Sequence, residues 1–306
     1  MSKIAIVGAG FVGSTAAYSL LLHGLAEEIA LVDIHREKAH GEAMDLEHGM
    51  QFVPNCKISF SNKYDVCAGA DIIIVCAGAH QKPGETRLDL VQKNAAIFKE
   101  MIPNIVKHNK ECIFLIVSNP VDILTYLTLK YSKFPANRVI GSGTTLDTSR
   151  FRYLLGKHFK VNPSSVHAYI LGEHGDSEFP VWSTANIAGI HLSRLKGYNT
   201  KSMKDIYNRT KKAAYEVIAK KGATYYAIGL GITKIVDAIL SDQNTVLPVS
   251  NLLKNYNGAS NVCLSVPCVL GKSGVKKQLV MPFDKKEKAC LNKSADILKR
   301  YIEKVK

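Results

Sequence analysis

The segment KIAIVGAGFVGSTAAYSLLLHG, residues 3–24, decides the fold class. An apolar run ends at Val7, and the pattern G-x-G-x-x-G follows directly at Gly8, Gly10 and Gly13. An Ala- and Leu-rich stretch with helical periodicity then covers residues 14–25. A strand, a tight glycine turn and a helix in this order bring backbone N–H groups and a helix N-terminus to a pyrophosphate. The segment therefore predicts the first unit of a dinucleotide-binding domain.

Asp33 narrows the choice of dinucleotide. A second apolar strand is expected at residues 29–33, and Asp33 ends it, 20 residues after Gly13. A carboxylate at this place accepts hydrogen bonds from the ribose hydroxyls of NAD and repels the 2′-phosphate of NADP. The glycine pattern alone also fits a tight turn without a ligand, but its full context favours an NAD site.

Strand and helix patterns alternate over the first half of the chain. Helices are expected at residues 37–50 and 94–107, and strands at the apolar runs 71–76 (DIIIVC) and 113–117 (IFLIV). Strands that alternate with helices predict an α/β fold with a doubly wound parallel sheet of the Rossmann type. We assign this domain to residues 1–142.

The pattern changes after Ser142. Helical segments lead into short strands near residues 262–266 and 275–280, and Asp284 with Glu287 gives a capping signal for a final helix. We therefore predict a second, α+β domain that carries the catalytic residues, at residues 143–306. Because no flexible linker separates the halves, we expect a tight interface between them.

The composition restricts the class of protein. A chain of 306 residues is long enough for two domains of about 150 residues each, and 46% hydrophobic residues are typical of a globular protein. No apolar run approaches the roughly 20 residues of a membrane span. The first strand begins at Lys3, which leaves no room for a signal peptide, so we expect a cytoplasmic protein without membrane contact.

Cysteines and charge point to no further partner. The seven cysteines form neither C-x-x-C pairs nor metal-type spacing with histidine, so we interpret them as reduced thiols and predict no metal site. The net charge is +14, with Lys and Arg densest at residues 201–221 and 285–306 but without a nucleic-acid-binding motif. A solvated basic surface that attracts small anionic metabolites fits better than nucleic-acid binding.

His174 is the candidate proton donor. It is one of ten histidines, but it lies in GEHGD, where glycines let the backbone approach a ligand. Hydride transfer to a ketone needs a proton at the oxygen, and histidine titrates near neutral pH. In LDTSRFR, Asp147 is the candidate to orient the imidazole, and Arg150, three residues later, can bind a substrate carboxylate. Alone, this D-x-x-R spacing also fits a surface ion pair.

The segment at residues 78–90 (GAHQKPGETRLDL) follows an expected strand and carries both signs of charge. We predict a mobile loop at the carboxyl edge of the sheet that closes over a substrate and excludes water. Arg87 can then polarise the substrate carbonyl. Without this context, a solvated loop arginine is the favoured interpretation of Arg87.

Seven segments together resemble one enzyme family, at its order and spacing. They are GAGFVGS (8–14), LVDI (31–34), AGAHQKPGETRLDLVQKN (77–94), VSNPVDI (117–123), GSGTTLDTSRFR (141–152), HAYILGEHGDSEFPVW (167–182) and KGATYYAIG (221–229). The chain resembles the L-lactate and L-malate dehydrogenases over essentially its whole length, most closely the bacterial L-lactate branch. The resemblance implies reversible hydride transfer between NADH and pyruvate to give L-lactate and NAD⁺, the last step of fermentative glycolysis.

The resemblance also implies roles for individual residues. The implied catalytic residues are His174, Asp147 and Arg87. Substrate contacts are implied for Gln81, Arg87, Asn119, Asp122, Asp147, Arg150 and Thr224. NAD contacts are implied for Gly8, Gly10, Val12, Gly13, Asp33, Lys38, Tyr64, Gly78, Ala79, Val117, Asn119 and Ser142. A cis peptide bond is expected before Pro120, and Cys76, where many relatives have Thr, is expected to alter packing under the nicotinamide.

Gln81 carries the choice of substrate. Relatives that act on malate have an Arg at this position, which neutralises the second carboxylate of oxaloacetate. Gln is neutral, and enclosing an unpaired carboxylate away from water costs several kcal/mol. Pyruvate is therefore expected to be preferred over oxaloacetate.

Arg152 and His167 suggest regulation. Arg152 is two residues after Arg150, which rotates it by about 200° around a helix, so the two arginines cannot both face the substrate. In bacterial L-lactate dehydrogenases the matching Arg and His bind fructose 1,6-bisphosphate between subunits. The resemblance therefore implies this activator and a homotetramer. The alternative is that both residues make ordinary interface hydrogen bonds.

Three other functions remain to be weighed. A malate or branched-chain 2-hydroxyacid dehydrogenase is the nearest, and Gln81 and Thr224 argue against it. A silent NAD-binding sensor predicts loss of a catalytic residue, but His174, Asp147, Arg150 and Arg87 are all present. A nucleic-acid-binding protein predicts a clustered basic face that the sequence lacks.

Overall fold

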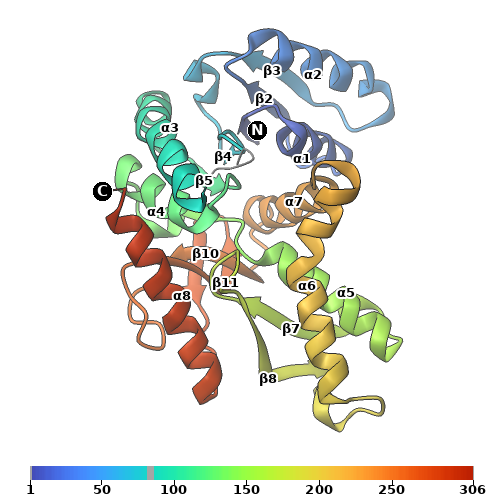
Figure 1. Cartoon of the computed structure of the whole chain (residues 1–306). Helices are drawn as coiled ribbons and strands as arrows, with labels where there is room; N and C mark the ends of the chain where they lie inside the picture. Colours follow the sequence, from blue (N-terminus) through green and yellow to red (C-terminus); the bar gives the residue numbers. More distant parts are fainter. Residues whose placement is uncertain (1, 81–85, 306) are drawn as a thin grey trace.

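The computed structural model describes residues 2–80 and 86–305. Within these residues, nine strands form one sheet in the order β12-β11-β10-β6-β5-β4-β1-β2-β3, and three strands form a second sheet in the order β7-β8-β9. Figure 1 shows β2, β3 and α2 at the top of the molecule and the second sheet, with α5 and α6, at the bottom. The site described below lies where these two parts meet.

The first half of the chain builds the parallel part of the large sheet. Its strands are β1 (Lys3–Val7), β2 (Glu28–Val32), β3 (Lys57–Ser61), β4 (Ile72–Val75), β5 (Ile113–Ile116) and β6 (Val139–Gly141). Its helices are α1 (Phe11–Leu22), α2 (Arg36–His48), α3 (Arg87–His108) and α4 (Val121–Ser132). All pairs between neighbouring strands from β3 to β6 are parallel. The predicted doubly wound sheet is confirmed, with the strand order typical of dinucleotide-binding domains.

Several elements of this half differ from the sequence prediction. β3 and β6 were not predicted, because β6 has only three residues and β3 (KISFS) begins with an exposed lysine. α3 begins at Arg87, seven residues before the predicted start, because Thr86 and Asp89 cap it reciprocally. The Thr86 backbone N–H donates to Asp89 Oδ2 at 2.8 Å, and the Asp89 N–H donates to Thr86 Oγ1 at 3.2 Å.

The second half adds helices and antiparallel strands. Its helices are α5 (Thr145–Phe159), α6 (Thr200–Lys221), α7 (Tyr226–Leu240) and α8 (Lys285–Glu303). Its strands are β7 (Val166–Leu171), β8 (Phe179–Ile187), β9 (Ile190–His191), β10 (Thr245–Leu252), β11 (Cys263–Gly271) and β12 (Gly274–Gln278). Short 3₁₀ helices occur in both halves. The first half contains η1 (Met50–Phe52), η2 (Tyr64–Cys67) and η3 (Ala136–Arg138), and the second half contains η4 (Pro163–Ser165) and η5 (Leu192–Arg194).

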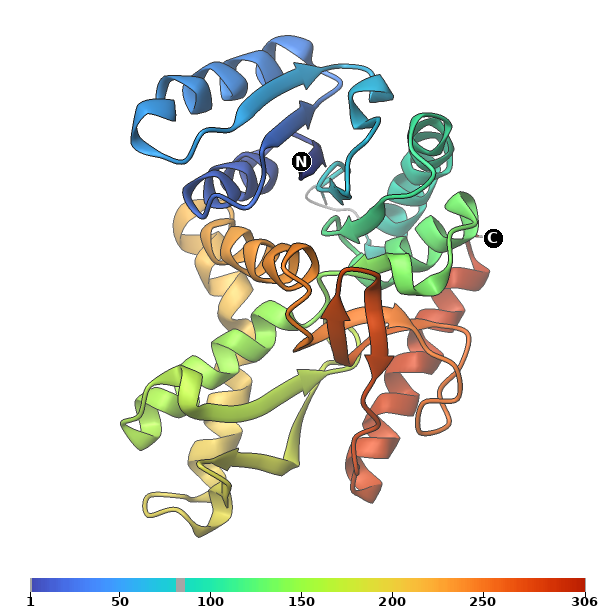
Figure 2. The ribbon, with the colours of Figure 1, turned by 180° about the vertical axis from the view of Figure 1, so that it is seen from behind.

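The two halves share one sheet. β10 pairs antiparallel with β6 through Ser250 and Gly141, so β10, β11 and β12 continue the nucleotide-binding sheet. Figure 2 shows these orange and red strands in the middle of the molecule. The sequence led us to expect a distinct α+β unit with a tight interface, and the interface is a continuous hydrogen-bonded sheet. This pairing joins residues far apart in the chain, which a local pattern cannot reveal.

The final helix agrees with its predicted signals. The Glu287 N–H donates to Asp284 Oδ1 at 2.8 Å, and the Asp284 N–H donates to Glu287 Oε2 at 3.1 Å, which completes the predicted capping box. Leu291, Ala295, Leu298 and Ile302 recur at helical spacing and are buried. α8 thereby packs on β8 and α4.

None of the helices within residues 2–80 and 86–305 combines the length and the apolar character needed to cross a membrane.

Candidate active site

The glycine turn after β1 forms a cradle that side chains would fill. A Cβ on Gly13 would lie 1.9 Å from the Gly8 carbonyl oxygen, and a Cβ on Gly8 would lie 2.5 Å from the Ala77 nitrogen. Gly8 also has φ +102°, which disfavours any other residue. At Gly10, by contrast, the nearest atom is Lys38 Nζ at 3.9 Å. The turn is therefore tight where strand and helix meet and open at the helix N-terminus, as a pyrophosphate requires.

Asp33 holds the glycine turn and remains partly accessible. Its Oδ2 accepts from the Ala9 N–H at 2.9 Å, and its Oδ1 accepts from the His35 N–H at 3.0 Å. The side chain lies at the end of β2 and is half-buried. Because each carboxylate oxygen can accept more than one hydrogen bond, Asp33 keeps acceptor capacity for the hydroxyls of a ribose. These residues fit an NAD molecule.

The other residues proposed to contact NAD lie in two groups. Gly78, Ala79, Val117 and Ser142 follow strands β4, β5 and β6, at the carboxyl edge where ligands bind in open α/β sheets. Val12 lies in α1, Lys38 lies in α2 and Tyr64 lies in η2. Burial raises the pKa of the Tyr64 hydroxyl.

Asn94 ties this edge together, and sequence reasoning missed it. Its Oδ1 accepts from the Ala79 N–H at 2.7 Å, and its Nδ2 donates to the Ala79 and Asn119 carbonyl oxygens at 3.2 and 2.7 Å. The Asn119–Pro120 peptide bond is cis, as expected. The Asn119 side chain is thereby presented at the sheet edge, where its residue is exposed.

His174, Asp147 and Arg150 lie together. His174 Nδ1 is 2.6 Å from Asp147 Oδ2, and Arg150 donates from a guanidinium nitrogen to Asp147 Oδ1 at 3.0 Å. Asp147 comes from the first turn of α5 and is 4% exposed, whereas His174 comes from the loop between β7 and β8. Both carboxylate oxygens of Asp147 are therefore used, and the contact to His174 is made by its Nδ1.

Asp122 fixes the backbone of His174. This residue lies in the first turn of α4 and is 2% exposed. Its Oδ2 accepts from the His174 backbone N–H at 2.8 Å, and its Oδ1 accepts from Ser250 Oγ at 2.6 Å. α4, β10 and the histidine loop are joined in this way, so the position of His174 depends on both halves of the chain.

The charges around His174 favour its protonated form. Burial lowers the pKa of the imidazole, but the Asp147 carboxylate outweighs burial and, with Asp122 and Glu178, raises the pKa to about 9. Burial raises the pKa of Asp147, but His174 and Arg150 bring it below its ordinary value. At neutral pH the pair is therefore a carboxylate and an imidazolium.

Glu178 is a second residue that sequence reasoning missed. It is 6% exposed, directly precedes β8, and its Oε1 has no hydrogen-bond partner within the described residues. No spacing rule separates this glutamate from the many exposed ones, because its burial arises from helix α6 packing over the loop. The Tyr207 hydroxyl of α6 donates to the Glu178 carbonyl oxygen at 2.6 Å.

The remaining substrate candidates are only partly described. Gln81 lies outside the described residues, together with residues 82–85 of the predicted loop, and residues 87–90 of that predicted loop belong to α3. Arg87 begins α3, but its side chain also lies outside the description. Thr224 lies between α6 and α7 and is half-buried.

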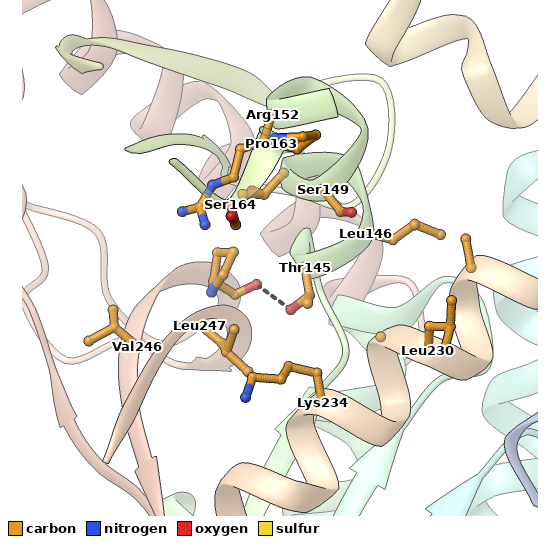
Figure 3. A pocket seen from close by; sticks show the side chains of 14 residues that line it. Thr145, Leu146, Ser149, Arg152, Pro163, Ser164, Leu230, Lys234, Val246 and Leu247 are labelled. Carbon is orange, nitrogen blue, oxygen red and sulfur yellow. Dashed lines mark hydrogen bonds between the residues drawn. The ribbon is translucent and has the colours of Figure 1, made fainter. Parts of the chain in front are cut away.

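Arg152 lies on a different face of α5 from Asp147, and His167 lies in strand β7. Arg152 Nε donates to the Ala168 carbonyl oxygen at 2.9 Å, and its guanidinium carbon is 4.9 Å from the centre of the Tyr169 ring. His167, which directly precedes Ala168, is exposed. Arg152 also lines a pocket of about 340 Å³ between α5, α7 and β10, which Figure 3 shows with Lys234 on its opposite side.

Known proteins resemble the chain along its whole length. An L-lactate dehydrogenase of Acetivibrio thermocellus is 53% identical and covers 99% of the chain and 97% of that protein. An L-lactate dehydrogenase of Clostridium botulinum is 52% identical, with 98% and 96% covered. A minor L-lactate dehydrogenase from Enterococcus mundtii, solved in a ligand-bound form, superposes with a TM-score of 0.97 at 41% identity, with 100% and 98% covered.

Two family models account for the two halves. The NAD-binding domain of lactate/malate dehydrogenases matches residues 2–141, and the α/β C-terminal domain of the same enzymes matches residues 144–306. The cofactor is therefore NAD, in agreement with the glycine cradle and Asp33. The chain belongs to the lactate/malate dehydrogenase family.

Proposed function

We propose that this chain reduces pyruvate to L-lactate with NADH and catalyses the reverse reaction with NAD⁺. The observation that carries the proposal is the arrangement of His174, Asp147 and Arg150, with His174 Nδ1 2.6 Å from the carboxylate that also binds Arg150. The names of the L-lactate dehydrogenases that share 52–53% identity with the chain support the same reaction.

NAD would be held by residues 1–142, and the acid–base group would come from residues 143–306. Gly8, Gly10 and Gly13 would hold the pyrophosphate at the N-terminus of α1, and Asp33 would accept hydrogen bonds from the ribose hydroxyls. When bound, NADH supplies the hydride. Asn119, held through its backbone by Asn94, would contact both cofactor and substrate.

His174 would act as acid in one direction and base in the other. Its Nδ1 proton stays with Asp147, which fixes the ring, so Nε2 gives its proton to the carbonyl oxygen as the alcohol forms. In lactate oxidation, Nε2 takes the hydroxyl proton. Arg150 would bind the substrate carboxylate, because a planar guanidinium matches the geometry of a carboxylate. Arg87 would polarise the substrate carbonyl.

Gln81 supports pyruvate rather than oxaloacetate as the substrate, since a neutral side chain leaves a second carboxylate unpaired. The test follows NADH absorbance with pyruvate, oxaloacetate and a branched 2-keto acid. We expect kcat/KM to be highest for pyruvate, by about tenfold or more. A higher value for oxaloacetate or the branched acid would favour the alternative dehydrogenases.

A matched pair of variants tests the role of Gln81. Gln81→Arg is expected to raise the ratio of oxaloacetate to pyruvate kcat/KM by about a hundredfold or more, because it supplies the missing cation. Gln92→Arg places the same charge on an exposed site of α3 and is the control. An unchanged ratio in Gln81→Arg would contradict the assignment.

We further propose that the enzyme is a cytoplasmic homotetramer activated by fructose 1,6-bisphosphate at Arg152 and His167. The exposed side chains of Phe11 and Tyr18 on α1, and of Tyr226 and Leu230 on the neighbouring α7, support burial against another copy. The free cysteines support a reducing compartment. Cationic residues next to an open pocket support an anionic effector.

A further inference from the structure

The side chain of Glu178 is buried in the loop that carries His174. Glu178 follows His174 by four residues, and its backbone N–H donates to the Gly175 carbonyl oxygen at 3.1 Å. From the other side, the Tyr207 hydroxyl donates to the Glu178 carbonyl oxygen at 2.6 Å. The backbone is therefore fixed between the histidine loop and α6. The side-chain Oε1 has no hydrogen-bond partner in the described part of the chain.

The groups that face Glu178 come from three elements. Asp147 and Arg150 come from α5, His174 comes from its own loop, and Lys211 comes from α6. Lys211 Nζ donates to the Asp176 carbonyl oxygen at 2.5 Å, which fixes the ammonium group beside the histidine loop. Burial raises the pKa of Glu178 to about 8 with the help of the Asp147 charge, while His174, Lys211 and Arg150 oppose this rise.

We propose that Glu178 is a positioning residue for the catalytic proton: its buried carboxyl group, whose Oε1 has no hydrogen-bond partner among the described residues, strengthens the hold of His174 on its proton when it ionises. A carboxylate buried without a hydrogen-bond partner is costly, which holds the proton on Glu178 while His174 is already paired with Asp147. Once Glu178 ionises, its charge favours the imidazolium. The two groups then lose their protons in two linked steps.

The sign of the effect follows from the charges that face His174. Asp147, Asp122 and ionised Glu178 each raise the pKa of His174. Of these three, Asp147 is needed to orient the ring and Asp122 to hold its backbone. Glu178 makes neither contact in the described structure. Its substitution can therefore change the proton affinity of His174 without removing a hydrogen-bond partner of that residue.

The test is the pH dependence of both reaction directions in Glu178→Gln. Glutamine resembles the protonated acid but cannot ionise. We expect the alkaline fall of kcat/KM for pyruvate and the rise of kcat/KM for L-lactate to move together toward neutral pH, by about half a unit to one unit. Glu216→Gln, which removes an exposed carboxylate from α6, is the control and should shift neither curve.

Midpoints that coincide with those of the unmodified enzyme would overturn the proposal. So would a uniform loss of activity with unmoved midpoints, because that result indicates a structural role alone. If Glu178→Gln does not fold, infrared spectra of the unmodified enzyme decide the question. We expect the band of a protonated carboxyl group to disappear between about pH 7 and pH 9. Absence of such a band at neutral pH would overturn the proposal.

Discussion

Helix α5 has two faces that differ in burial. One face is buried and fully hydrogen-bonded within a single chain, and the other lines an open pocket. On one face, Asp147 is 4% exposed and both its oxygens are bonded, to His174 and to Arg150. On the other face, Ser149 and Arg152 line an open pocket of about 340 Å³ (Figure 3). Groups that transfer a proton must be held in place by the fold itself. An open face that carries positive charge can instead bind a further molecule, such as an anionic effector.

This difference predicts that equal substitutions on the two faces have unequal effects. Changes on the His174 face should impair the reaction directly, because no other group can replace the lost contact. Changes on the Arg152 face should leave the unstimulated reaction intact and alter only its control.

Asp147→Asn should have the largest effect. The substitution keeps the shape but removes the charge that raises the pKa of His174 and the acceptor that fixes its ring. We expect kcat/KM for pyruvate to fall by about a hundredfold to ten-thousandfold, as for other histidines deprived of an orienting carboxylate. Initial rates at saturating NADH measure this. Asp205→Asn, on the exposed face of α6, is the control, and a loss below tenfold in Asp147→Asn would contradict the role.

Arg150→Lys should have the next largest effect. Lysine keeps the charge but cannot bind a carboxylate with two parallel hydrogen bonds. We expect kcat/KM for pyruvate to fall by about thirtyfold to a hundredfold, mostly through KM, with NADH affinity unchanged. Arg152→Lys is the matched control, two residues away on the same helix. Equal losses in the two variants, or a parallel loss of NADH affinity by fluorescence titration, would remove the distinction between the faces.

Local sequence patterns were sufficient for one face of this comparison and for the cofactor cradle. The approach of His174 to Asp147 was expected from the family resemblance, whereas the three-residue spacing on a helix pairs Asp147 with Arg150, and the glycine pattern needs only one strand and one helix to take shape. Such contacts are encoded within a few residues. The capping box of α8 was predictable for the same reason.

Contacts between distant segments were not predictable from the residues themselves. Ser250 reaches Asp122 across 128 positions, and Asn94 reaches Asn119 across 25. The continuation of the sheet through β10 and the burial of Glu178 beneath α6 also depend on how finished elements pack. Residue type and spacing carry no signal for these, because any serine, asparagine or glutamate would look the same before folding.

Arg152→Gln should have the smallest effect and tests the open face. In the unmodified enzyme we expect fructose 1,6-bisphosphate to lower the pyruvate concentration at half-saturation by about fivefold or more, the lower end of typical allosteric coupling. Arg152→Gln should abolish this response and change unstimulated kcat by less than about twofold, because the side chain contacts Ala168 and Tyr169 rather than His174. Arg194→Gln, in η5, removes an exposed charge elsewhere and should respond like the unmodified enzyme. A flat response of the unmodified enzyme, or a retained response in Arg152→Gln, would leave the pocket without this effector and α5 with a single functional face.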